Sequence, residues 1–294
     1  MPKSDDMPEL SVVIVTYNSA NEIDACLKSI FKSVGVSIEV IVVDNASSDS
    51  TCSIVSGYST VCLVSNRLNY GFPKANNIGI SYSTGDLFLL LNPDTIVGTD
   101  SILKLVQFLR THPKCGIVGP QLVDGNGIPV PDLPVIGPNI LFSRFINVST
   151  QREELKCVSG AALCFSREFL SKVGLLDEEL FWCEDYDYCR RAHLNGYTVN
   201  MVRNSIIVHL GQRSGNSNKE LMIEKSYTSK IGYLSKYHSA SYVNLSIFVF
   251  LGELFLRMVK WSSFWFRTEH REESIERLRI YSNVSRVLVS RLYL

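Results

Sequence analysis

Side chains suited to a metal ion follow two apolar runs of this sequence. Asp94 stands shortly after the run 87–91, and His209 directly follows the run 206–208. Mg²⁺ or Mn²⁺ commonly takes one or two protein carboxylates and completes its shell with substrate phosphates and water, and imidazole can join such a shell. An Asp after Asn-Pro can instead cap a turn, and a solitary histidine after a strand is usually structural. The two residues therefore predict a metal site only if their strands lie side by side.

Three acids gather beside aromatic residues in the stretch 181–187, Phe-Trp-Cys-Glu-Asp-Tyr-Asp, just ahead of a helical pattern. Aromatic surroundings can raise the pKa of a carboxyl group and suit it to act as a general base. Acids at a helix N-terminus also stabilise the helix in many proteins that catalyse nothing. Both interpretations stay open, for different members of the cluster.

Other polar residues with a possible binding role follow the first apolar runs or lie in the loop and early helix after residue 65. Asp44 can accept hydrogen bonds from a base or ribose, although the turn that it begins also suits a helix cap, and alone the turn is favoured. Flexible backbone and amides near residue 70 can follow a sugar or phosphate. The candidates are Thr16, Tyr17, Asn18, Asp44, Asn69, Gly71, Asn76 and Asn92.

Strand and helix patterns alternate through the first 120 residues. Apolar runs predict strands at 11–16, 39–43, 61–64, 87–91 and 116–119. Helical spacing predicts helices after a capping box at Ser19 and Glu22, around 54–55, from Pro73 to Ser81, and after a cap at Asp100. This order predicts an α/β fold with a doubly wound, mainly parallel sheet. In such a sheet ligands bind beyond the carboxyl ends of the strands, where the candidate residues stand.

The rest of the chain divides into a further α/β portion and a helical C-terminal region. Residues 120–156 show no regular pattern and suggest a functional loop. A strand at 161–165, a helix at 185–194 ended by Gly196, and two short strands at 197–202 and 206–209 follow. We expect a catalytic domain at 1–220 and a helical region at 221–294.

The stretch 242–266 is crowded with apolar and aromatic residues but is interrupted by Glu253, Arg257 and Lys260. These charges make it a poor membrane span. Aromatic residues mixed with basic ones are typical of a helix in a membrane interface, and a helix packed on the catalytic domain is the equal alternative.

Composition limits the functional classes. The chain has 294 residues, 46% of them apolar, and a formal net charge of zero, which disfavours disorder and nucleic-acid binding. Eight cysteines without a C-x-x-C pair disfavour a zinc cluster and suit a reducing compartment. The first ten residues lack the order of a signal peptide, so we expect a cytoplasmic protein.

Five motifs in order, over about residues 10 to 210, resemble the family 2 glycosyltransferases, and within them the bacterial rhamnosyltransferases of polysaccharide and O-antigen assembly. The motifs are Ser11-Val-Val-Ile-Val-Thr-Tyr-Asn-Ser19, Val42-Val-Asp-Asn-Ala-Ser-Ser-Asp49, Asn69-Tyr-Gly-Phe72 with Ala75-Asn-Asn77, Leu91-Asn-Pro-Asp-Thr95 and Cys183-Glu-Asp-Tyr-Asp-Tyr-Cys-Arg190. Asn92-Pro93-Asp94 departs from the Asp-x-Asp of many relatives.

The resemblance implies a GT-A fold and a role for each candidate. Thr16, Tyr17, Asn18 and Asp44 would hold the nucleoside of a nucleoside-diphosphate sugar. Asp94 would bind Mg²⁺ or Mn²⁺ on the diphosphate, with His209 on the metal side. Asp185 would be the general base, with Glu184 its neighbour, in a single displacement with inversion.

The expected substrates follow from the same resemblance. L-Rhamnose from dTDP-rhamnose is the first-choice donor, and the acceptor is a saccharide or a polyprenyl-linked sugar at the cytoplasmic face of the inner membrane. Transfer of one sugar is favoured because no Gln-x-x-Arg-Trp motif is present. Peripheral membrane contact and a homodimer are the other expected associations. The rival functions are a nucleotidyltransferase, which usually has a basic Gly-rich loop after its first strand, and a non-catalytic membrane-associated partner.

Overall fold

The computed structural model describes residues 7–131, 133, 136, 157–211, 219–264 and 271–292. They form two compact units. Unit 1 comprises 7–131, 133, 157–178 and 184–211, and unit 2 comprises 136, 179–183, 219–264 and 271–292.

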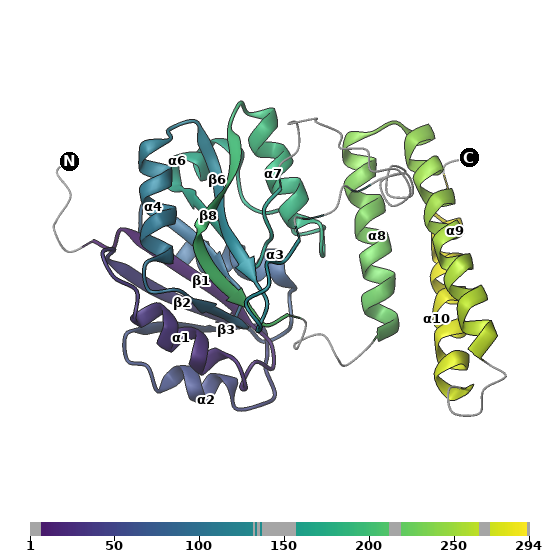
Figure 1. The fold of residues 1–294 in the computed structure, drawn as a ribbon, viewed down its shortest axis with the longest axis horizontal. Coiled ribbons are helices and arrows are strands. Elements are labelled where there is room, and N and C mark those ends of the chain that lie inside the picture. The colour runs from purple at the N-terminus through teal and green to yellow at the C-terminus, as the bar shows by residue number, and fades with distance from the viewer. Residues whose placement is uncertain are drawn as a thin grey trace. The chain divides into compact units, whose positions relative to one another are not determined.

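Unit 1 is an α/β structure built on one eight-stranded sheet (Figure 1). Its strands are β1 (Leu10–Thr16), β2 (Ile38–Asp44), β3 (Val61–Ser65), β4 (Leu87–Leu91), β5 (Thr95–Val97), β6 (Cys115–Val123), β7 (Ala162–Ser166) and β8 (Thr198–His209). Its helices are α1 (Ile23–Phe31), α2 (Thr51–Ser56), α3 (Phe72–Tyr82), α4 (Ser101–Thr111), α6 (Arg167–Val173) and α7 (Glu184–Leu194).

The strand order is β3-β2-β1-β4-β7-β6-β8-β5. The pairs β3–β2, β2–β1, β1–β4 and β6–β8 are parallel, whereas β7 is antiparallel to both neighbours and β5 is antiparallel to β8. The expected α/β class with a mainly parallel sheet is therefore confirmed. The carboxyl ends of β1, β2 and β4 lie at one edge, because these strands run in the same direction.

Helices cover both faces of the sheet, which explains why its inner strands are apolar throughout. In β1, Val12 and Ile14 pack in one core with residues of α1, α2 and α4. Val13 faces the opposite core, which contains residues of α3, α6 and α7. The period-two alternation of side chains thus divides one strand between two cores.

Helix α3 lies against the sheet at Gly79. A Cβ at this position would overlap the Val13 Cγ1 methyl and lie 3.1 Å from Val43 Cγ2. We expect Gly79→Ala to lower the free energy of unfolding by about 1–3 kcal/mol through overpacking. The matched change Gly252→Ala, on a helix position with nothing within 4 Å, should instead stabilise by about 0.5–1 kcal/mol. Urea unfolding measures both, and equal effects at the two sites would contradict the close approach of α3.

Several local expectations are corrected by the structure. The capping box is wrong: Glu22 directly precedes α1 and caps nothing with its side chain, while Ser19 Oγ accepts from the Tyr17 amide at 3.3 Å. Asp100 precedes α4 as expected, but its carboxylate pairs with Lys104 at 2.8 Å instead of capping. The two short strands expected after Gly196 form the single strand β8, with an irregularity in its pairing to β6. Strand β5 and helix α6 had no counterpart in the sequence prediction.

Unit 2 contains three helices among its described residues: α8 (Lys219–Tyr237), α9 (Ala240–Phe264) and α10 (Arg271–Val289). Each of the three packs on the other two. By length and composition alone, α9 could cross a membrane, since an 18-residue window of it has a mean hydropathy of 1.6. The expectation that its charges make it a poor span is not supported by this criterion.

Candidate active site

The candidate residues at the ends of β1 and β2 lie side by side. Thr16 pairs with Asp44 in the parallel register, and its hydroxyl donates to Asp44 Oδ1 at 2.9 Å. The Ser47 amide donates to Asp44 Oδ2 at 2.9 Å. Thr16 is fully buried and Asp44 nearly so. The Thr16 hydroxyl therefore orients Asp44 and is not itself exposed, whereas Tyr17 is exposed.

Asn18 joins the loop after β1 to the loop after β2. Its backbone is left-handed, with φ of 53°, a conformation that Asn adopts more readily than most residues. Its backbone amide donates to Ser47 Oγ at 2.8 Å, and its side-chain Oδ1 accepts from the Ser48 backbone amide at 2.8 Å. These bonds give the edge of the sheet a fixed surface beside Asp44.

The three candidates near residue 70 have different positions. Asn69 Oδ1 accepts from the Gly71 amide at 2.9 Å, and the Gly71 carbonyl accepts from Asn45 Nδ2 at 3.2 Å, which ties this loop to the end of β2. Gly71 has φ of 85° and directly precedes α3. Asn76 is fully buried, and its Nδ2 donates to the Phe72 carbonyl at 2.9 Å within α3. Its Oδ1 is also buried and has no hydrogen-bond partner among the described residues.

Asp94 and His209 lie together, which is the geometric condition that their metal role requires. Strand β5 starts directly after Asp94 and pairs with the end of β8, with Thr95 opposite His209. The Leu210 amide donates to the Asp94 carbonyl at 3.0 Å, and His209 Nε2 lies 3.3 Å from Asp94 Oδ1. The Asp94 side chain is 9% exposed and that of His209 is 21% exposed, so both can be reached from solvent.

Asn92 connects β4 to the segment that precedes β7. Its amide donates to the Ala161 carbonyl at 3.0 Å, and its own carbonyl accepts from Thr95 Oγ1 at 2.7 Å. The first bond ties the segment 92–95 to its neighbour, and the second, from the Thr95 side chain, closes the turn within it.

Asp185 contacts the segment before β7 at Gly160, the residue that precedes Ala161. Its Oδ2 accepts from the Gly160 amide at 3.0 Å, and its Oδ1 accepts from the Tyr186 amide at 2.8 Å. A Cβ added to Gly160 would lie 3.6 Å from Asp185 Oδ2 and 3.6 Å from Glu184 Oε1, so both carboxylates border this glycine. Burial raises the pKa of Asp185 to about 6. The two amide hydrogen bonds favour the charged form and lower the pKa, but burial has the larger effect.

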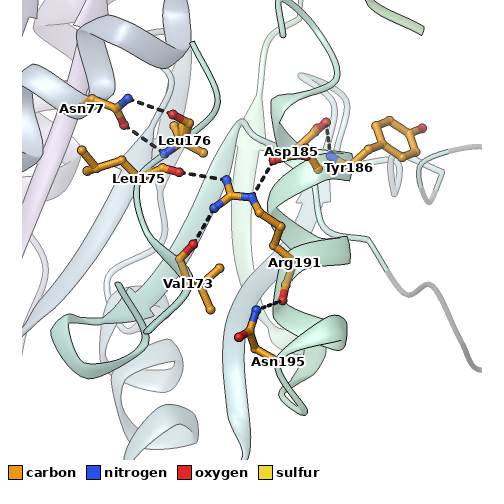
Figure 2. Close-up of polar contacts among 9 residues, drawn as sticks. Asn77, Val173, Leu175, Leu176, Asp185, Tyr186, Arg191 and Asn195 are labelled. Carbon is orange, nitrogen blue, oxygen red and sulfur yellow. Dashed lines mark hydrogen bonds and ion pairs between the residues drawn. The ribbon is translucent and has the colours of Figure 1, made fainter. Parts of the chain in front are cut away.

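Asp187, the third acid of the cluster, has a structural contact. It is fully buried and accepts from Arg191 Nε at 2.7 Å. The other guanidinium nitrogens of Arg191 donate to the carbonyls of Val173 and Leu175 at 2.8 and 2.9 Å, as Figure 2 shows. The cluster is thus divided, because Asp185 faces Gly160 while Asp187 holds Arg191.

Asn77 holds the same chain segment from the other side. Its Nδ2 donates to the Leu176 carbonyl at 2.9 Å, and its Oδ1 accepts from the Leu176 amide at 3.1 Å (Figure 2). Helices α3 and α7 are therefore linked through residues 173–176. The sequence prediction gave no role to Asn77 or Arg191, whose partners here are largely backbone groups.

A family model for glycosyl transferase family 2 matches residues 11–174, more than half of the chain. The chain belongs to glycosyl transferase family 2. The expected family is thereby confirmed. Low-salt glycan biosynthesis hexosyltransferase Agl10 of Haloferax volcanii is 26% identical over 215 residues, which are 69% of this chain and 67% of that protein. The chain spans 44% and 60% of the lengths of two further curated relatives.

Solved structures of glycosyltransferases share the fold of this family 2 chain. Mannosyltransferase PcManGT from Pyrobaculum calidifontis, in complex with GDP-Man and Mn²⁺, has a TM-score of 0.62 at 18% identity and covers 96% of this chain and 87% of its own. TarS 1-349 of S. aureus with UDP-GlcNAc has a TM-score of 0.56 at 19% identity, with 94% and 81% covered. These likenesses confirm the GT-A fold expected from the motifs.

The donor set of this family 2 chain fits a divalent ion held jointly with a substrate. In the described part of the chain, no three His, Cys, Asp or Glu side chains come together as a metal cluster. Asp94 Oδ1 and His209 Nε2 are 3.3 Å apart. Neighbouring ligands of an octahedral ion with bonds of about 2.1 Å lie about 3 Å apart, so the two atoms suit adjacent positions on one ion. Phosphate and water oxygens would complete the shell.

A cavity of about 160 Å³ adjoins His209. His209 and Ser159 line it together with apolar residues of β6, β7 and β8, including Leu122, Ala162 and Met201. His209 and Ser159, the residue before Gly160, thus border one space.

The Arg191 contact yields a stability prediction. Arg191→Met should lower the free energy of unfolding by about 3 kcal/mol or more, because it removes the cation beside a fully buried carboxylate. The matched control is Lys172→Met, which breaks an exposed i,i+4 pair with Glu168 in the same unit and should cost less than about 1 kcal/mol. Urea unfolding of both variants measures the difference, and similar losses would contradict the structural role of Arg191.

Proposed function

We propose that this chain is an inverting glycosyltransferase that moves a single sugar from a nucleoside-diphosphate sugar to an acceptor hydroxyl in glycan or polysaccharide biosynthesis. Family membership supports the reaction class. One observation supports the mechanism above all: Asp94 and His209 meet at the sheet edge where Asp185, a half-buried acid with a raised pKa, borders Gly160.

The donor half of the site lies along the ends of β1, β2 and β4. We assign nucleoside binding to Asp44 with Tyr17 and Asn18, and the loop with Asn69 and Gly71 to the sugar or phosphates. Asp94 and His209 would hold Mg²⁺ or Mn²⁺. When bound, this ion stabilises the negative charge that develops on the departing diphosphate.

The acceptor half contains Asp185. A carboxylate with a pKa near 6 is ionised at neutral pH yet remains a better proton acceptor than an ordinary Asp. Asp185 would take the proton from the acceptor hydroxyl as its oxygen attacks the anomeric carbon opposite the leaving diphosphate. Such a single displacement inverts the anomeric configuration. Glu184, the other carboxylate beside Gly160, would assist in orienting the acceptor.

For the substrates, our first choice is L-rhamnose from dTDP-rhamnose, transferred to a saccharide or polyprenyl-linked acceptor at the cytoplasmic face of the inner membrane. The order of the sequence motifs supports the rhamnosyl assignment. The relative Agl10 is named a glycan biosynthesis hexosyltransferase, which supports a glycan as product. We place the membrane contact in unit 2.

The test is release of nucleoside diphosphate by the purified full chain from a panel of thymidine, uridine and guanosine diphosphate sugars, with Mg²⁺, Mn²⁺ or chelator, and with lipid-linked acceptor present. We expect metal-dependent release from one donor. Release of pyrophosphate from a nucleoside triphosphate and a sugar phosphate would favour a nucleotidyltransferase instead. No turnover with any donor would favour a non-catalytic partner.

A further inference from the structure

Helix α9 is apolar on two opposite faces. One face is buried in unit 2 and consists of Val243, Ser246, Ile247, Phe250 and Leu254. The other carries five large apolar side chains that are 52–63% exposed, and we call them the α9 stripe: Leu245, Phe248, Phe255, Leu256 and Val259. At 100° per residue these five fall within one side of the helix. An exposed, contiguous apolar face of this kind marks a contact surface.

The two opposite charges near the middle of α9 face its helical neighbours and leave the stripe clear. Glu253 pairs with Arg257 at 2.8 Å. Tyr227 of α8 donates to Glu253, and Arg257 donates to Tyr281 of α10. Crossing a membrane as a lone helix would break these bonds and bring a Glu and an Arg into hydrocarbon, which is costly. The packing therefore favours an α9 that keeps one face on α8 and α10.

Charge distinguishes the possible occupants of the stripe. Residues 219–294 contain twelve Lys and Arg, seven Glu and no Asp, a formal net charge of +5. The whole chain is neutral, so residues 1–218 carry −5. A basic region that bears an apolar stripe is attracted to anionic lipid, whereas two copies of it would repel each other. Lys260 lies one residue beyond the stripe and is exposed.

We propose that α9 lies in the plane of an anionic membrane surface, with the α9 stripe inserted into one leaflet and α8 and α10 on the water side. The stripe extends over about 21 Å at 1.5 Å per residue, the length of an ordinary interfacial helix. This inference rests on the proposed lipid-linked acceptor for its purpose, because it would hold the enzyme where that acceptor is displayed. Its test requires no sugar transfer.

The experiment is flotation of the full chain with phosphatidylcholine vesicles, with and without phosphatidylglycerol, at low and high salt. We expect binding only with the anionic lipid and several-fold weaker binding at high salt. Leu256→Glu in the stripe should weaken binding at least about tenfold. Leu194→Glu, a matched change at an equally exposed leucine in unit 1, should not; the two side chains are 63% and 67% exposed.

Two further measurements decide against the competing arrangements. Trypsin added outside the vesicles should still cut at both Lys236 and Arg271, which flank α9, and protection of the Arg271 side would overturn the in-plane arrangement in favour of a span. Sedimentation in the absence of lipid should give the same mass for wild type and Leu256→Glu. A wild-type dimer that this change splits, with vesicle binding unaffected, would overturn the proposal in favour of a second copy.

Metal-dependent release of nucleoside diphosphate, measured with a water-soluble acceptor, should be the same in wild type and Leu256→Glu. Failure of vesicle binding with intact turnover would therefore overturn the membrane contact alone. Failure of turnover with intact vesicle binding would overturn the proposed function alone.

Discussion

Asp185→Asn is expected to lower the rate of sugar transfer by about a thousandfold or more while leaving donor binding nearly unchanged. The asparagine keeps the size of the side chain and one of its two amide hydrogen bonds but cannot accept the acceptor proton, and general-base catalysis contributes about 10²–10⁴-fold. The measurements are transfer under single-turnover conditions and calorimetric titration with donor and metal. In the wild type, the transfer rate should also fall as pH drops through about 6, the raised pKa of Asp185. This fall should be absent from the residual activity of the variant.

The same substitution is expected to remove a pH-dependent loss of stability. Burial lifts the pKa of Asp185 in the folded chain to about 6 from an ordinary value of 3.8. Below a pH equal to the ordinary pKa of 3.8, Asp185 is protonated in both the folded and the unfolded chain, so its burial does not lower the stability. Between the two values the unfolded chain ionises first, so stability falls as pH rises, and above about 6 a constant cost of roughly 2–3 kcal/mol remains. Asp185→Asn removes that cost at the expense of one amide hydrogen bond, which is lost at every pH. The melting temperature of the variant relative to the wild type should therefore rise as pH increases from about 4 to 8.

Glu184→Gln is the control that tests the assignment between the two neighbouring carboxylates. We expect a smaller loss of transfer from it than from Asp185→Asn. Full activity in Asp185→Asn, together with a large loss in Glu184→Gln, would exchange the roles of the two residues. A melting-temperature difference between Asp185→Asn and the wild type that does not change with pH would contradict the raised pKa of Asp185.

The strands with continuous apolar sequence could be predicted. Their carboxyl ends, where the candidate residues lie, could be predicted with them. The runs at β1, β2 and β4 are buried on both faces, so hydrophobicity alone located them. Strand β5 has only three residues, too few to show any period. Yet β5 is the element that brings Asp94 to His209. The sequence could therefore show that a metal site requires Asp94 and His209 to lie close together, but it could not predict that they do.

Helical phase separates the contacts of Asn76 from those of Asn77. Asn76 and Asn77 are consecutive residues of α3, and consecutive residues on a helix point about 100° apart. Asn76 bonds within its own helix, while Asn77 reaches Leu176, a residue 99 positions away in sequence. The sequence named Asn76 as a candidate and gave Asn77 no role, because only the packing of α3 decides which of the two amides makes a contact outside the helix.

Arg191 was missed for a different reason. Two of its three side-chain hydrogen bonds go to backbone carbonyls, and every residue of a chain carries such an acceptor. No residue type in the segment 173–175 signals the contact. The acid cluster was recognisable from composition, but the division between Asp185, which faces Gly160, and Asp187, which holds Arg191, depends on where α7 lies.

Asp94→Asn and His209→Ala are each expected to raise the Mn²⁺ concentration needed for half-maximal donor binding by about 10–100-fold, the usual effect of weakening a metal's protein environment. Loss of the Asp94 charge should have the larger effect, because a carboxylate is the preferred ligand of such ions. Excess Mn²⁺ should restore donor binding in part. Electron paramagnetic resonance of free Mn²⁺ measures metal uptake directly, in the presence of nucleoside diphosphate and without any turnover.

The double variant tests whether both residues serve one ion. If Asp94 Oδ1 and His209 Nε2, which lie 3.3 Å apart, bind the same ion, the two losses should combine to less than their sum. Independent sites would give additive losses. Asp100→Asn is the matched control, since this carboxylate is exposed and already paired with Lys104, and it should leave the Mn²⁺ titration unchanged. An unchanged titration in Asp94→Asn would remove Asp94 from the metal site and leave His209 without a partner for that role.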